Sequence, residues 1–221
     1  MSPNAAGILI CIVCGEVDAT CFVALGGTFA GLMTGNLILL GVSLGGSTDG
    51  VAAAVFLYPL GGYAFGAVMA GLFFKCRGLP RASQQGLWLG CAWLVFITIF
   101  VWLVPVTANS GTGWLVVTLS ALYLGFQSAV LYLSKRVTIT TNVMTSTMTS
   151  FLADYPLQAA NGNVSWHKLF ALLGFLFGVI LGALLAATDI RFSFLISAFL
   201  AVVAVFGLTQ NQSAADTGSK A

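Results

Sequence analysis

Residues 7–25, GILICIVCGEVDATCFVAL, decide the fold class, because they are long and apolar enough to cross a membrane and yet carry Glu16 and Asp18 at their centre. The rest of the chain has the same character: 59% of its 221 residues are hydrophobic and 6% are charged. A soluble domain carries about 25% charged residues, so this chain has too few to cover a water-facing surface. The apolar runs are continuous, whereas the strands of a membrane barrel alternate over ~10 residues. We therefore expect an all-α, polytopic membrane helix bundle.

Six stretches are long enough to cross a hydrocarbon core of ~30 Å, which takes about 20 helical residues. They cover residues 7–25, 51–74, 86–106, 113–133, 168–187 and 192–208. Two shorter stretches, residues 28–42 and 137–152, are interrupted by polar residues, and we expect them to be broken or re-entrant segments. If both also span the membrane, the bundle has eight helices instead of six. The positions of Lys and Arg favour six helices with both termini in the cytoplasm, by one charge.

The apolar part of the chain contains two internal repeats. Residues 1–208 are expected to form one membrane domain, with halves of roughly 1–107 and 108–208, and the polar residues 209–221 a disordered tail. The pattern Gly15-x-x-x-Ala19 in the first half recurs as Gly125-x-x-x-Ala129 in the second. Repeats of this kind are common in secondary transporters, which bind their solute where the repeats meet.

Each half also contains a helix with glycines four residues apart. These glycines are Gly62 and Gly66 in the first half and Gly174, Gly178 and Gly182 in the second. Small residues at this spacing allow the backbones of two helices to approach closely. We expect them to serve helix packing and to hold together a homodimer.

The two carboxylates are the first candidates for a functional site. Because Glu16 and Asp18 are two residues apart, they point ~200° apart on a regular helix and cannot both face one narrow cavity. Ionisable side chains at membrane depth are costly and are usually retained where an ion or polar solute is handled. Asp18 is therefore a candidate cation or proton site. The alternative is that Asp18 is held by hydrogen bonds to a neighbouring helix, for example to Asn36 or Thr34.

Uncharged polar residues in the two short segments are the second set of candidates. Thr34, Gly35 and Asn36 interrupt the first segment, and a broken helix with these residues can contact a solute or ion. They can equally form a polar contact between helices. The same two interpretations apply in the second half to Gln127, Thr141, Asn142 and Thr145.

The pattern around Asp18 resembles a known family. The residues concerned are Gly15-x-Val17-Asp18-Ala19-x-x-Phe22, Gly26, Phe29 and Met33-Thr34-Gly35-Asn36, followed in the second half by Gly125-x-Gln127-x-Ala129. They resemble the signatures of the YoaK family of bacterial inner-membrane proteins, a domain-of-unknown-function family. The resemblance implies about six membrane helices and a multi-pass location in the bacterial cytoplasmic membrane, and it implies no activity. Glu16 departs from the family pattern, in which an aromatic or apolar residue is expected.

The sequence favours a secondary transporter or exporter of a small polar or ionic solute, with Asp18 as the coupling site. The alternative is a channel or a membrane scaffold that transports nothing. The lipid bilayer and a small solute or ion are the expected partners, and scattered basic residues give no reason to expect nucleic acid. The chain has no recognisable nucleophile–base pair, phosphate-binding loop or metal-ligand set, so we expect no enzymatic activity, no cofactor and no metal.

Overall fold

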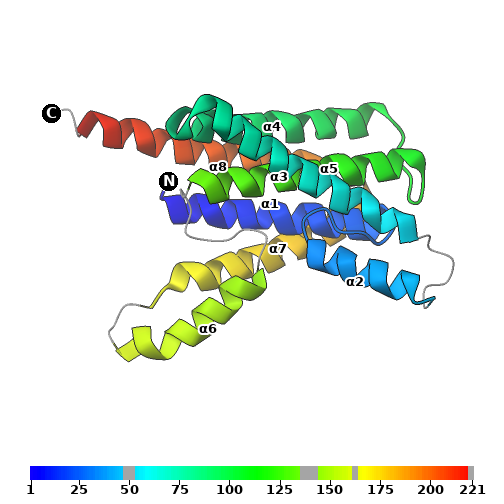
Figure 1. Ribbon diagram of the computed structural model, residues 1–221, viewed down its shortest axis with the longest axis horizontal. Helices are drawn as coiled ribbons and strands as arrows, with labels where there is room; N and C mark the ends of the chain where they lie inside the picture. Colours follow the sequence, from blue (N-terminus) through cyan, green and yellow to red (C-terminus); the bar gives the residue numbers. More distant parts are fainter. Residues whose placement is uncertain (47–52, 135–143, 161–163, 219–221) are drawn as a thin grey trace.

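The structure, a computed structural model, describes residues 1–46, 53–134, 144–160 and 164–218 (Figure 1). Every regular element in these ranges is helical. The elements are α1 (Pro3–Ala24), α2 (Met33–Leu44), the 3-10 helix η1 (Ala53–Phe56), α3 (Leu57–Arg77), α4 (Leu79–Leu103), α5 (Gly111–Ser134), α6 (Met144–Ala160), α7 (Trp166–Thr188) and α8 (Ile190–Gly218). In the described part, six helices are long and apolar enough to cross a membrane: α1, α3 with η1, α4, α5, α7 and α8. The predicted membrane helix bundle is confirmed.

The two short predicted segments correspond to α2 and α6. Helix α2 has 12 residues and begins only at Met33, so it is too short to cross the hydrocarbon core. Helix α6 begins at Met144 and contains Pro156, while residues 137–143 of the predicted segment lie outside the described residues. In Figure 1, α2 starts partway along the bundle and ends at the side where α3 begins. Helix α6 likewise starts partway along and ends at the side where α7 begins.

The directions of the long helices agree with six spans. Figure 1 shows α1, α4 and α7 running one way along the long axis of the molecule, and α3, α5 and α8 running the other way. Each half contributes three long helices, and because three is odd, the second half is inverted relative to the first. This is the inverted-repeat arrangement found in many membrane transporters.

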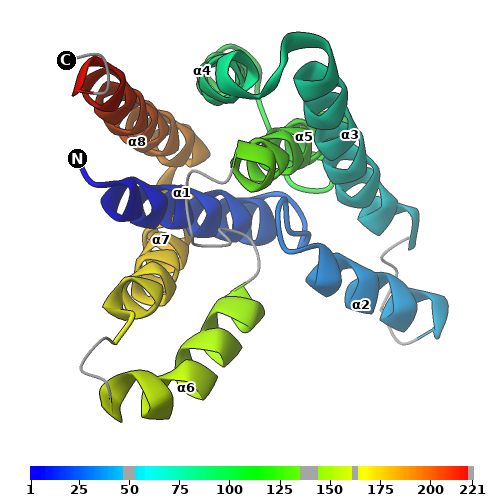
Figure 2. The same ribbon diagram turned by 60° about the vertical axis from the view of Figure 1, so that its left-hand side comes forward.

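The halves are interlocked by two equivalent parallel helix pairs. Helix α1 packs along α7, and α3 packs along α5 (Figure 2). A Cβ atom would run into the partner backbone at Gly178 (Ile12) and Gly182 (Glu16) in the first pair, and at Gly62 (Thr118) and Gly66 (Leu122) in the second, while at Gly174 it would press on the Ile8 side chain. Helices this close exclude any side chain from the contact. These glycine faces are filled by helices of the same chain and are not free to meet a second copy, while the homodimer itself stays a prediction.

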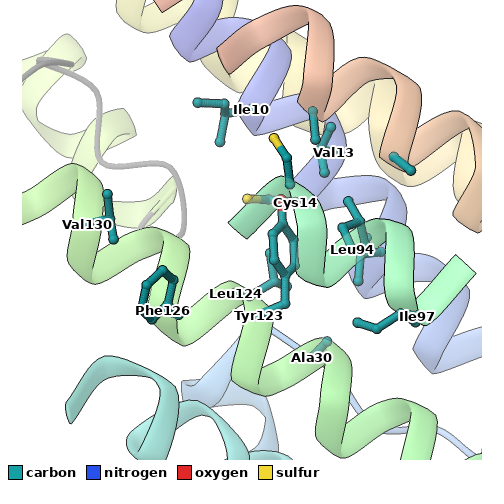
Figure 3. Packing of buried hydrophobic residues seen from close by; sticks show 14 of the residues in the cluster. Ile10, Val13, Cys14, Ala30, Leu94, Ile97, Tyr123, Leu124, Phe126 and Val130 are labelled. Atoms are coloured by element: carbon teal, nitrogen blue, oxygen red, sulfur yellow. The ribbon is translucent and has the colours of Figure 1, made fainter. Parts of the chain in front are cut away.

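The core is shared by α1, α4, α5 and α8, with a smaller contribution from α3. Figure 3 shows Tyr123 and Leu124 of α5 near Cys14 of α1 and Leu94 of α4, all of them buried. Ala30, which lies between α1 and α2, belongs to the same cluster, so the connecting segment is part of the core. The outer faces of the helices are apolar and exposed, as on α7, where the exposed residues include Phe170, Leu173, Leu176, Phe177, Ile180 and Leu184. Such a surface is suited to lipid and not to water.

The ends of the bundle differ in charge. Both termini lie at one end of the molecule (Figure 1). The helix ends that carry Lys75, Arg77, Arg81 and Lys168 lie at that same end, whereas Arg191 begins α8 at the other. The end with the termini is therefore the more basic one, as the positive-inside rule expects of a cytoplasmic face.

The last helix is longer than the sequence predicts. We expected disorder from residue 209, but α8 continues to Gly218. Gln and Ala residues in this tail, at positions 210, 212, 214 and 215, have high helix propensity and allow the backbone to continue beyond the apolar part.

Candidate functional site

The segment between α1 and α2 folds back into the bundle and ends beside Asp18. Asp18 lies about 9 Å before the end of α1, at 1.5 Å of rise per residue. The chain reverses at Gly26 and Gly27, whose φ angles of 112° and 76° favour glycine. The Gly31 amide then donates a hydrogen bond to Asp18 Oδ1 at 2.5 Å. Residues 25–32 therefore form a re-entrant turn that brings the start of α2 back along α1 to the level of Asp18.

Asp18 takes the place of the capping residue that α2 lacks. The N-cap position of α2 is Leu32, and no side chain of its own segment caps the helix. The amides of Ala30 and Leu32 also face the Asp18 carboxylate. The N-terminus of a helix has unpaired N–H groups and a partial positive charge, which an anion satisfies. Asp18 on α1 thus supplies this anion, and its side chain is only 5% exposed.

Asn36 closes the same turn from the other side. Its Oδ1 accepts a hydrogen bond from the Phe29 amide at 3.0 Å, and its Nδ2 donates to the Phe29 carbonyl at 2.7 Å. The Phe29 ring stacks on Phe22 of α1 with ring centroids 4.7 Å apart. A Cβ at Gly35 would lie 2.9 Å from the Phe29 ring, so glycine is needed there. Asn36 is fully buried, and this two-point contact fixes the turn to the first helical turn of α2.

The other predicted polar residues lie elsewhere. Glu16 faces α8, where Ser193 donates to Glu16 Oε1 at 3.3 Å, in agreement with the opposite directions predicted for the two acids. Gln127 is buried where α5 meets Gly90 of α4. Thr34 and Thr145 are exposed. Thr141 and Asn142 lie outside the described residues. The structure thus brings Asp18, Gly35 and Asn36 to one turn and puts Glu16 and Gln127 at two separate helix contacts.

Several residues of these sites were not singled out from the sequence. The most important are the backbone amides of Ala30 to Leu32, which have no sequence signal at all. Thr28 in the re-entrant turn is fully buried, and its hydroxyl has no hydrogen-bond partner in the described ranges. Ser193 and Ser197 both face Glu16. Two serines four residues apart on an apolar helix lie on the same face, and this spacing can be recognised in the sequence.

The arrangement can hold an anion or a cation, but it has no set of transition-metal ligands. Within the described ranges, His, Cys, Asp and Glu side chains form no group of three or more that could hold a metal ion. The re-entrant turn offers amide donors that suit an anion, and Asp18 fills this position from within the chain. The chemistry available is therefore ion or solute binding by oxygen atoms and backbone amides.

Six helices of membrane-spanning length, two inverted halves and a buried re-entrant turn define a multi-pass α-helical membrane protein. The chain belongs to the DUF1275 family, described as a protein of unknown function, whose model matches residues 6–207. The YoaK family that the sequence resembles is a member of it, so this resemblance is confirmed. No curated protein and no solved structure matches the chain significantly.

Proposed function

We propose that the protein is a secondary transporter or exporter of a small polar or ionic solute in the bacterial cytoplasmic membrane, with Asp18 as its coupling residue. The observation that carries the proposal is the contact between the buried Asp18 carboxylate and the start of α2. Inverted repeats and half-helices that begin near the bilayer midplane are the elements from which many secondary transporters build their sites.

In the proposed mechanism, the negative charge on Asp18 holds the start of α2 against α1. A carboxylate is attracted to the N–H groups of Ala30, Gly31 and Leu32, and this attraction holds the re-entrant turn in place. When Asp18 takes up a proton or a cation, its negative charge is neutralised and the attraction weakens. The turn can then move relative to α1, which changes access to the amides that Asp18 had occupied. A ligand that binds one arrangement better than the other shifts the balance between them.

The experiment is transport by the purified protein in liposomes with an imposed pH or Na⁺ gradient. A panel of small polar and ionic solutes is tested with wild type, Asp18→Asn and Asp154→Asn. Asp154→Asn is the matched change at a partly exposed position outside the Asp18 site, where Asp154 pairs with Lys168 at 2.9 Å. We expect gradient-driven flux in wild type and Asp154→Asn, and loss of that flux in folded Asp18→Asn. Flux that continues unchanged in Asp18→Asn contradicts the proposal.

A second candidate function is a membrane scaffold that transports nothing, and one observation favours it. The Asp18 carboxylate is buried and already hydrogen-bonded to the Gly31 amide, which is what a purely structural cap requires. Under this alternative, Asp18→Asn lowers thermal stability, and no solute of the panel crosses the membrane with wild type under any gradient.

A further inference from the structure

A second polar cluster lies between α1 and α8, on the side of α1 away from Asp18. Glu16 is fully buried there, and Ser193 donates to its Oε1 at 3.3 Å. The hydroxyls of Thr20 and Ser193 hydrogen-bond to each other at 2.5 Å. The Ser197 hydroxyl also faces Glu16. We call Glu16, Thr20, Ser193 and Ser197 the Glu16 cluster.

Two oxygen atoms of the Glu16 cluster are poorly satisfied within the described residues. Glu16 Oε2 and Ser197 Oγ are buried, and although the Ser197 hydroxyl faces the carboxylate, neither atom makes a hydrogen bond of normal length and angle there. No basic side chain in these ranges pairs with Glu16, since the ion pair found there joins Lys168 to Asp154. A buried carboxylate without a countercharge is strongly unfavourable, and so is a buried polar atom without a partner. Both costs are removed by a positive ion placed among these oxygens.

We propose that the Glu16 cluster binds one small monovalent cation such as Na⁺. All of its available ligand atoms are carboxylate or hydroxyl oxygens, which hard cations prefer. The cluster has a single negative charge, so a monovalent ion gives a neutral site, whereas a divalent ion leaves one charge uncompensated in a low-dielectric region. The cation joins α1 to α8 and provides the partner that Glu16 Oε2 lacks.

The packing around Glu16 makes the site rigid. A Cβ at Gly182 of α7 would run into the Glu16 carbonyl oxygen, so the backbone that carries Glu16 is held directly against α7. In the other half, where Gly125 corresponds to Gly15, the position that corresponds to Glu16 is occupied by Phe126, which has no charge. The cation site is therefore present in one half only. It is independent of Asp18 and of the transport proposal.

Equilibrium binding of radioactive Na⁺ to the full chain in detergent, with choline as the replacement ion at constant ionic strength, tests the site. We expect one Na⁺ bound per chain and a melting temperature that rises with Na⁺ concentration. Glu16→Gln is expected to abolish both effects, while Asp18→Asn retains them. Ser120→Ala is the control, because Ser120 also carries a buried hydroxyl but lies on α5, outside the cluster.

Two serine variants keep the proposal testable if Glu16→Gln fails to fold. Ser193→Ala and Ser197→Ala leave the carboxylate in place and are expected to weaken Na⁺ binding about 10- to 100-fold, as loss of a supporting group does in metal sites. Wild type that binds no Na⁺ overturns the proposal, as does binding that survives Glu16→Gln or is unchanged in both serine variants. If a proton alone fills the site, neither binding nor stability depends on Na⁺. If transport is lost while Na⁺ binding remains, the result bears on the transport role of Asp18 and leaves the Na⁺ site supported.

Discussion

The Asp18 carboxylate accepts a hydrogen bond from the Gly31 amide at 2.5 Å, across the turn that joins α1 to α2. A side chain of α1 therefore caps the start of α2, the next helix in the sequence, after the connecting turn has folded back into the bundle. A Cβ at Gly31 would lie 2.9 Å from Leu124 Cδ1 and 3.2 Å from Asp18 Oδ2, so a side chain there would push on both residues.

Removal of the Asp18 side chain should destabilise the protein. Asp18→Ala leaves the amides at the start of α2 buried without a partner, a loss of about 1–3 kcal/mol. Asp18→Asn retains an acceptor oxygen and should lose less. Thermal unfolding in detergent measures the difference. A melting temperature for Asp18→Ala equal to that of wild type contradicts the capping role.

Asn36 should be needed for the same turn. Asn36→Ala removes both hydrogen bonds to the Phe29 backbone, at about 1 kcal/mol each. The control is Thr34→Ala, an exposed position in the same helical turn, where we expect a change within about 0.5 kcal/mol. If the two variants unfold at the same temperature, the contact between Asn36 and Phe29 contributes no stability.

The glycine contacts between the halves should be sensitive to a single methyl group. In Gly66→Ala the new Cβ would run into the Leu122 carbonyl oxygen of α5, so the helices must separate, at a cost of about 1–3 kcal/mol. Gly71 lies on the same helix with nothing within 4 Å of its Cβ position. Gly71→Ala should be neutral or stabilising by up to about 1 kcal/mol, since alanine favours helix. Equal stability of the two variants would rule out the close α3–α5 contact.

Cys76 provides a natural reporter of topology. It is exposed near the end of α3, while the other four cysteines are buried. With six spans, a membrane-impermeant maleimide should label Cys76 only from the side where both termini lie, and Cys76→Ser should abolish labelling. With eight spans, Cys76 lies on the opposite side from the termini. Labelling from that opposite side therefore rejects the re-entrant assignment of α2.

The sequence was sufficient for the membrane class, the six long helices and the two repeats, because these depend on the length and spacing of apolar residues. It could not identify the partner of Asp18, since the donors are backbone amides of Ala30 to Leu32 and every residue type except proline provides such a group. It could not pair Glu16 with Ser193 either, because 177 residues separate them. The glycine spacing predicted close helix contacts, but whether the facing backbone belongs to the same chain depends on the packing of the whole bundle.

Hydrogen exchange of residues 25–32 in the reconstituted protein tests the central claim, that the charge on Asp18 holds the re-entrant turn inside the bundle. In wild type the amides of this segment should be protected as strongly as the adjoining part of α1, whereas in Asp18→Asn they should exchange faster while α1 and α7 remain protected. Equal protection of residues 25–32 in the two proteins would contradict the claim.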